Sequence, residues 1–209
     1  MTSNTPETAP LTAFALTCSL KPSPAESSTD LLTRQLLDQL AQHGVTGDLI
    51  RAVDHDIKPG VEVDMGEGDD WPALRERILA ADIFILAAPI WLGGMSSVAR
   101  RILERLDAEL SYTDEQGRLL TYGKVAGVCV VGNEDGAHAV TASAYQGLSD
   151  VGFTIPAGGV TYWNGEAMHG IDYKDLDETP EVTATTTATL AANAAHLAGV
   201  LRSAPYPQV

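Results

Sequence analysis

The sequence predicts a three-layer α/β domain in which helices cover both faces of a doubly wound parallel sheet. Two stretches, 83–88 and 125–131, are continuously apolar, as expected of strands that are buried on both faces. Segments of strand and helix character alternate along the chain without an internal repeat. A length of 209 residues suits one such domain with a sizeable core.

The first half of the chain supplies two strands and the first helix. A strand is predicted over 12–18, and a helix over 30–42, where leucines recur at helical spacing and Gly44 ends the run. A second strand is predicted over 46–53. The next stretch, 55–70, is rich in acids, glycine and proline and has no clear period, so we expect a long solvated connection.

The central unit is the one around which the other elements are arranged. Asp70-Trp71-Pro72 opens a helix that leads into the apolar strand 83–88, and Pro89 is predicted to end this strand. The following helix is predicted to begin at Ser96 or Ser97. The loop between strand and helix therefore lies at the carboxyl edge of the sheet, where open α/β folds bind ligands.

The second half of the chain completes the alternation. An excursion over 111–123 is predicted to contain a hairpin around Glu115-Gln116-Gly117. The second apolar strand is followed by a helix that Gly152 closes, and a last strand is expected within 153–163. A C-terminal helix is predicted to begin at Thr179-Pro180-Glu181.

The ends of the chain are expected to lie outside the folded domain. We divide the sequence into a flexible N-terminal tail over 1–11, one domain over 12–202 and a C-terminal tail over 203–209. The first ten residues lack the basic and apolar regions of a signal peptide. No apolar run approaches the roughly 20 residues that a membrane helix needs.

The charge balance excludes some classes of partner. Thirteen lysines and arginines stand against 28 aspartates and glutamates, which gives a formal net charge of -15. Binding of nucleic acid rests on neutralising phosphates with basic groups, so we expect no nucleic-acid partner and no anionic membrane surface. An acidic surface serves solubility, or docking of a basic partner.

The cysteines and histidines show no metal-binding pattern. Cys18 and Cys129 both fall in apolar strand-like runs, which predicts buried free thiols and is consistent with the cytoplasm. No Cys-x-x-Cys spacing is present, and the five histidines lack ligand spacing. We therefore expect no metal site.

The loop after the first strand has the features of a phosphate site. It carries hydroxyl groups up to the start of a helix, where free backbone N–H groups and the helix dipole favour an anion. Lys21 could assist as a point charge. A ligand-free Ser/Thr helix cap is the alternative. The glycine-rich patterns GxGxxG and GxxxxGK[ST] are absent from this loop. The hydroxyls belong to Ser19, Ser23, Ser27, Ser28 and Thr29.

Two further loops lie at the same predicted edge. The sequence 90–94 combines large apolar side chains with two glycines, which suits a flat apolar ring better than a sugar or an ion. The turn 132–136 offers backbone donors and Asn133. Alone, Trp91 could simply be packing and the turn simply a turn. Together, the three loops indicate a mononucleotide with a planar head group.

The same residues resemble the NAD(P)H-dependent FMN reductases of the flavodoxin superfamily. The resemblance rests on Ser19-Leu20-Lys21 with Ser27-Ser28-Thr29, on Pro89-Ile90-Trp91-Leu92-Gly93 and on Asn133-Glu134-Asp135-Gly136. Two later segments, 152–156 and 161–163, also fit, and the likeness covers about 11–201. The chain departs from many relatives in having Cys18 before the serine, and in a longer first loop.

The resemblance implies a flavodoxin-like fold with strand order 2-1-3-4-5. It places the phosphate of FMN on the first loop and the ring between the second and third loops. We expect backbone contacts from the third loop, because the carboxylate of Glu134 or Asp135 beside a reduced, anionic flavin would be unfavourable. His138 could touch the flavin or its substrate, or face solvent at a helix start. The cofactor-binding residues expected on these grounds are Ser19, Lys21, Ser27, Ser28, Thr29, Pro89, Ile90, Trp91, Leu92, Gly93, Gly94, Asn133, Glu134, Asp135, Gly136 and His138.

The implied activity is transfer of hydride or electrons from the co-substrate NADH or NADPH, through FMN, to a small acceptor. That acceptor could be free flavin, a quinone or a similar electrophile. No catalytic side chain is required, because the chemistry belongs to the flavin. Two alternatives stay open: an electron carrier of the flavodoxin type that a partner protein reduces, and a cofactor-free binding domain. By analogy with relatives, a homodimer or homotetramer is expected.

Overall fold

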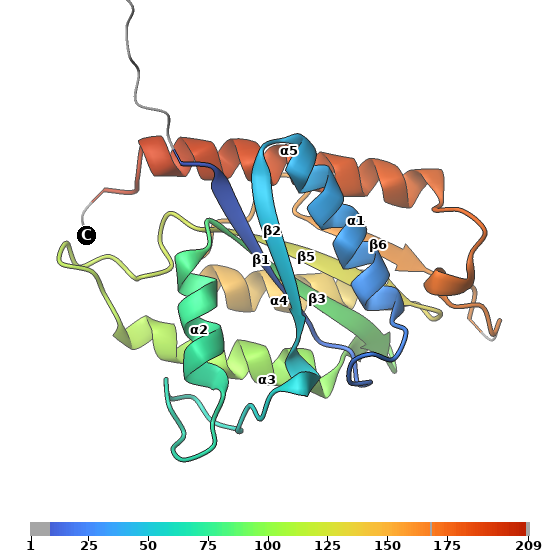
Figure 1. Cartoon of the computed structure of the whole chain (residues 1–209), viewed down its shortest axis with the longest axis horizontal. Coiled ribbons are helices and arrows are strands. Elements are labelled where there is room, and N and C mark those ends of the chain that lie inside the picture. The colour runs from blue at the N-terminus through green and yellow to red at the C-terminus, as the bar shows by residue number, and fades with distance from the viewer. Residues whose placement is uncertain (1–8, 168, 208–209) are drawn as a thin grey trace, which may run out of the picture.

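The computed structural model describes residues 9–167 and 169–207, and in these residues a twisted parallel sheet is enclosed by five helices (Figure 1). The sheet order is β2-β1-β3-β5-β6, and β4 pairs with β3 in an antiparallel hairpin. The strands are β1 (Leu11–Thr17), β2 (Val45–Arg51), β3 (Ile83–Trp91), β4 (Gly94–Met95), β5 (Val125–Gly132) and β6 (Val160–Asn164). The helices are α1 (Ser28–Gln42), α2 (Trp71–Ala80), α3 (Ser97–Leu106), α4 (Ala137–Asp150) and α5 (Glu181–Ser203).

The flavodoxin-like fold is confirmed. The five parallel strands, counted in chain order, follow the predicted order 2-1-3-4-5, and the short β4 is an addition that the sequence did not reveal. The predicted hairpin in the excursion is present as an antiparallel bridge between Thr113 and Leu119. Residues 1–8, most of the predicted N-terminal tail, lie outside the described residues.

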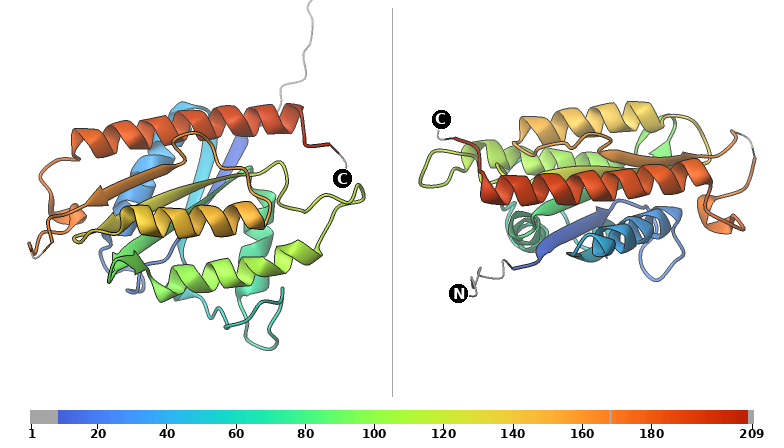
Figure 2. Two further views of the ribbon diagram at one scale, coloured as in Figure 1. Left: turned by 180° about the vertical axis from the view of Figure 1, so that it is seen from behind. Right: turned by 90° about the horizontal axis from the view of Figure 1, so that it is seen from above.

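The helices divide between the two faces of the sheet. One core packs side chains of β1, β3 and β5 against α2, α3 and α4, and it includes the fully buried Trp71 and Phe84. The other core packs the opposite strand faces against α1 and α5, with Leu36 and Leu190 fully buried. Seen from behind, α3 and α4 lie in front of the strands (Figure 2). Strands β3 and β5 are buried on both faces, which explains their continuous apolar sequence.

Pro89 does not end the central strand, contrary to the prediction. Strand β3 continues to Trp91, and Pro89 is in register with Val131 of β5. In the parallel ladder, an N–H group at position 89 would face the carbonyl of Cys18. Because proline has no N–H, that carbonyl instead accepts a hydrogen bond of 2.8 Å from the Ser96 hydroxyl. The proline therefore leaves no unsatisfied acceptor, and the strand runs on.

The acidic connection between β2 and α2 has a buried anchor that the sequence analysis did not include. The guanidinium of Arg105 donates to both carboxylate oxygens of Asp69, at 3.1 and 2.8 Å, and to the carbonyls of Lys58 and Glu62. The side chains of this ion pair are fully buried. The segment is thus a loop with exposed acids that is tied to α3 at one point.

The electrostatics of that anchor favour the ionised carboxylate. Burial by itself raises the pKa of Asp69, but hydrogen bonds from Arg105 and from backbone N–H groups lower it well below its usual range.

Among the described residues, no helix is both long and apolar enough to cross a membrane.

Candidate functional site

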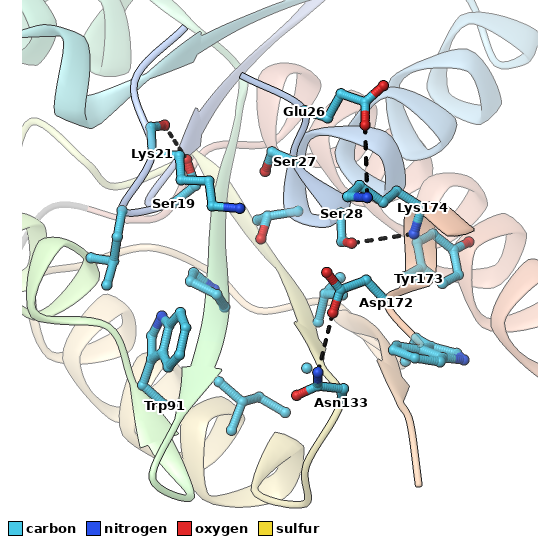
Figure 3. A pocket seen from close by; sticks show the side chains of 17 residues that line it. Ser19, Lys21, Glu26, Ser27, Ser28, Trp91, Asn133, Asp172, Tyr173 and Lys174 are labelled. Carbon is cyan, nitrogen blue, oxygen red and sulfur yellow. Dashed lines mark hydrogen bonds and ion pairs between the residues drawn. The ribbon is translucent and has the colours of Figure 1, made fainter. Parts of the chain in front are cut away.

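A cavity of about 380 Å³ opens at the carboxyl edge of the sheet (Figure 3). It is bounded by the ends of β1, β3, β5 and β6 and by the segment between β6 and α5. This is the position at which open α/β sheets bind ligands. The lining residues are Ser19, Leu20, Lys21, Glu26, Ser27, Ser28, Thr29, Pro89, Ile90, Trp91, Val131, Gly132, Asn133, Trp163, Asp172, Tyr173 and Lys174.

One end of the cavity is the N-terminus of α1. The Ser27 hydroxyl accepts a hydrogen bond of 3.2 Å from the N–H of Asp30, and the first intrahelical bond joins the N–H of Leu31 to the carbonyl of Ser27. The N–H groups of Ser28 and Thr29 precede that bond, so helix geometry gives them no partner within the helix. With the helix dipole, they form a positive end suited to an anion.

A buried arginine holds the loop that leads to this helix. Arg51, at the end of β2, donates at 2.9 Å to the carbonyl of Lys21 and at 2.9 Å to the carbonyl of Ala25. It also pairs with Asp30 in the first turn of α1 at 2.6 Å. The side chain of Arg51 is 6% exposed. The guanidinium of Arg51 thus fixes both the loop after β1 and the start of α1. No local pattern in the sequence marks Arg51 for this role.

The walls of the cavity are apolar and partly aromatic. Ile90 and Trp91 come from β3, and Val131 and Trp163 come from β5 and β6. Trp91 is 53% exposed, although it is large and apolar. Figure 3 shows Trp91 and Asn133 on opposite sides of the opening. An exposed tryptophan over a cavity is typical of a ring-binding wall rather than of core packing.

The segment between β6 and α5 closes a further side of the cavity. Asp172 accepts a hydrogen bond of 3.1 Å from the Asn133 side chain. Tyr173 is buried, and its hydroxyl donates to Gln35 of α1 at 2.6 Å. No periodicity in the sequence of this stretch marks these residues. The one signal was Trp163, whose ring lies 5.5 Å from that of Tyr173.

The cavity brings together several of the residues that the sequence singled out, and leaves others beside it. Their roles in cofactor binding stay predictions. The predicted residues that line the cavity are Ser19, Lys21, Ser27, Ser28, Thr29, Pro89, Ile90, Trp91 and Asn133. The predicted residues outside the lining are Leu92, Gly93, Gly94, Glu134, Asp135, Gly136 and His138.

Residues outside the lining hold the second loop (90–94) and the third loop (132–136) in contact with each other. The N–H of Leu92, in the left-handed region at φ 51°, donates to the Glu134 carboxylate at 2.9 Å. Gly136 has a φ of 127°, and a Cβ there would lie 2.6 Å from the carbonyl oxygen of Gly93. The close approach of two backbones therefore requires glycine at 136. His138 contacts the Tyr162 hydroxyl at 3.2 Å and is not among the residues that line the cavity.

The thiols are buried and free, as predicted. Burial raises the pKa of Cys18 and raises that of Cys129 to about 12, so neither thiol is a ready nucleophile. Over residues 9–167 and 169–207, no cluster of three histidine, cysteine or acidic side chains could hold a metal ion.

The fold and the cavity define a class of protein, the flavodoxin-like α/β domains with a cavity at the carboxyl edge of the sheet. The model of the NADPH-dependent FMN reductase family matches residues 12–167, and the chain belongs to this family. Membership of this family supports a flavin-dependent oxidoreductase.

Two of the similar proteins have flavin phosphates in their names. The chain is 32% identical to 8-demethyl-8-aminoriboflavin-5'-phosphate synthase of Streptomyces davaonensis, over 94% of this chain and 80% of that protein. The crystal structure of RosB, with the bound intermediate 8-demethyl-8-formylriboflavin-5'-phosphate, superposes with a TM-score of 0.85 at 32% identity, over 94% and 82% of the two chains. An archaeal flavodoxin shares the fold at a TM-score of 0.58 and 8% identity, over 90% and 99% of the chains.

One relative is much longer than this chain. The chain is 40% identical, over 92% of its length, to a protein of Mycobacterium bovis named divalent metal cation transporter MntH, but it covers only 29% of that protein. The similarity therefore concerns one part of a larger protein.

Proposed function

We propose that the chain binds FMN in this cavity and reduces it with NADH or NADPH, and that the electrons pass to a small acceptor such as free flavin or a quinone. The observation that carries this proposal is that the cavity is polar at one end and apolar along its walls. One end offers helix N–H groups and hydroxyls, and the walls offer flat apolar surfaces beside Trp91 and Trp163. A volume of about 380 Å³ lies within the range of about 300–1,000 Å³ for small-molecule sites.

The donor set fits a phosphate. The N–H groups of Ser28 and Thr29 would hold it together with the hydroxyls of the first loop. The Ser28 hydroxyl oxygen accepts a bond from the N–H of Lys174, which leaves its own hydrogen available to a ligand. Ile90, Trp91 and Val131 would exclude water from the flanks of the ring.

Bound FMN supplies the redox chemistry, so the chain needs no side-chain nucleophile or base. The work of the protein is to hold the phosphate, to orient the ring and to leave a path for a second substrate. Asn133 stands where an amide could contact the polar edge of a ring, and the half-exposed Trp91 leaves the opening accessible.

An anaerobic reduction experiment tests this proposal. Protein loaded with FMN is mixed with NADH or with NADPH, and the visible flavin absorbance is followed. Bleaching by either nucleotide supports a reductase. A yellow protein that neither nucleotide bleaches would indicate a carrier of the flavodoxin type, and a protein that does not quench FMN fluorescence would indicate a cofactor-free domain.

A second candidate is an enzyme for which a flavin phosphate is the substrate. It is favoured by the 32% identity and TM-score of 0.85 to RosB, whose structure holds a flavin phosphate altered at position 8. Mass spectrometry of the flavin after incubation separates the two candidates. Unchanged FMN after many turnovers supports a cofactor, and a flavin of altered mass supports a substrate.

The remaining expectations belong to the same proposal. We propose a cytoplasmic protein that acts on small molecules and assembles as a homodimer or homotetramer. Light scattering after size exclusion gives the mass of the assembly, and fractionation of cells that produce the full-length protein gives its location.

A further inference from the structure

Three residues lining the cavity lie beyond the residues that the family model matches. The match ends at residue 167, and Asp172, Tyr173 and Lys174 follow it in the segment between β6 and α5. Lys174 is the basic one of the three, and it reaches the end of the cavity at which α1 begins (Figure 3).

The position of Lys174 is fixed by its backbone and by two carboxylates. Its N–H donates at 3.2 Å to the hydroxyl of Ser28, the first residue of α1. Its ammonium group lies 2.6 Å from Asp175 and 3.7 Å from Glu26. The Lys174 side chain is 23% exposed, so most of it is packed against the protein.

The two carboxylates differ in how firmly they hold the ammonium group. The hydrogen bond to Asp175 raises the pKa of Lys174 and keeps the amine cationic at neutral pH. Glu26 is farther away and its side chain is 86% exposed, so little opposes its rotation into solvent. An anion bound at the N-terminus of α1 would meet the ammonium group of Lys174 and would repel the carboxylate of Glu26.

We propose that Lys174 is a specificity-determining residue that selects phosphorylated flavins over riboflavin, with Glu26 occupying its free side until the phosphate binds. This inference rests on the proposed function, because it names a further contact of the same site. A lysine is a flexible point charge, and its bond to a phosphate is charge-assisted. Riboflavin presents no such charge, so its binding gains nothing from Lys174.

Affinities of the two flavins for the apo-protein test the inference by fluorescence quenching. For Lys174→Met, the Kd of FMN should rise by about tenfold to a hundredfold, the range for a hydrogen bond to a charged group, while the Kd of riboflavin changes by less than about twofold. Glu26→Gln should lower the Kd of FMN and leave that of riboflavin unchanged. Lys174→Arg should keep the preference for FMN.

The control variant Arg100→Met removes one positive charge from α3, away from this cavity, and should leave both affinities unchanged. Equal weakening of both flavins by Lys174→Met would mean that the residue only holds its segment in place, and would overturn the inference. Unchanged binding of FMN would overturn it as well. If neither flavin binds to the wild-type protein, the proposed function fails and this inference fails with it.

Discussion

Removal of the Arg51 side chain is the sharpest test of how the fold builds the end of the cavity at which α1 begins, where we propose that the phosphate binds. Its guanidinium bonds to the carbonyls of Lys21 and Ala25 and to the carboxylate of Asp30, and it is almost completely buried. In Arg51→Met, both carbonyls lose a donor and Asp30 keeps a buried charge. The Oδ1 atom of Asp30 already lacks a hydrogen-bond partner among the residues that the structure describes.

The expected loss of stability follows from these contacts. Breaking a buried ion pair by removing one partner costs about 3–5 kcal/mol, because a charge is left uncompensated. Two backbone carbonyls that each lose about 1 kcal/mol, and a charge-assisted bond worth about 1.5–3 kcal/mol, give a similar total. Arg51→Lys keeps the charge but cannot reach three acceptors at once, so we expect an intermediate loss.

Urea unfolding and FMN titration of the same variants measure the two consequences. Arg51→Met should lower the free energy of unfolding by about 3–5 kcal/mol and weaken FMN binding by about tenfold, since the loop loses its support. Adding Asp30→Asn should recover at least about 1 kcal/mol by removing the unpaired charge.

Arg100→Met removes a surface ion pair of 4.0 Å and serves as the matched control, with an expected change below about 1 kcal/mol. If the free energy of unfolding of Arg51→Met lies within about 1 kcal/mol of the wild-type value and FMN binds equally well, the guanidinium does not organise the loop after β1.

Three further predictions concern the Asp69–Arg105 ion pair, the contact between the loops 90–94 and 132–136, and Trp91 in the wall of the cavity. Asp69→Asn should lower the free energy of unfolding by about 3–5 kcal/mol at pH 7, because Arg105 is left unpaired. The pKa of Asp69 is lower in the folded protein than in the unfolded chain, where it is about 4. The difference in free energy of unfolding between the wild type and the variant should therefore be full above pH 4 and should shrink as the pH falls below it. Urea midpoints at pH 7 and pH 3 measure this change. Gly136→Ala should destabilise the protein more than Gly93→Ala in thermal unfolding, because its Cβ would clash with backbone, whereas that of residue 93 meets open space. Trp91→Ala should weaken FMN binding in a fluorescence titration with little loss of thermal stability, since the side chain is half exposed.

The sequence predicted the fold well because its strongest signals are local. Strands β3 and β5 are buried on both faces, so every residue is apolar and no alternation confuses the assignment. The serine at the start of α1 accepts the N–H that its type and position predict, and Ser96 does the same for α3. The error at Pro89 arose because the strand continues only where another donor satisfies the carbonyl of Cys18. That donor is the Ser96 hydroxyl, and no local rule can show this contact.

The sequence was less informative on the surroundings of the cavity, for a related reason. Arg51, Asp172 and Lys174 act through contacts with residues about 20 to 150 positions away, and none stands in a recognisable pattern. Conversely, Glu134 and Gly136 belong to a recognisable turn, yet they brace the neighbouring hairpin instead of lining the cavity. Loop residues are predicted by motif, but their contacts are decided by which loops the topology makes neighbours.

The acidic composition excludes some anions and not others, and distance explains the difference. A net charge of -15 repels a polyanion that must lie along much of the surface, which is why we expect no nucleic-acid partner. A phosphate in the cavity interacts mainly with charges within a Debye length of roughly 8–10 Å, because salt screens exposed charges beyond it. The N-terminus of α1 has its own N–H groups and the neighbouring Lys174 within that range, and Arg51 neutralises Asp30 there. The ammonium group of Lys174 is itself paired with Asp175 and Glu26. For the flavin phosphate that we propose as ligand, we therefore expect the affinity to depend on a few donors at one helix end more than on the overall charge of the chain.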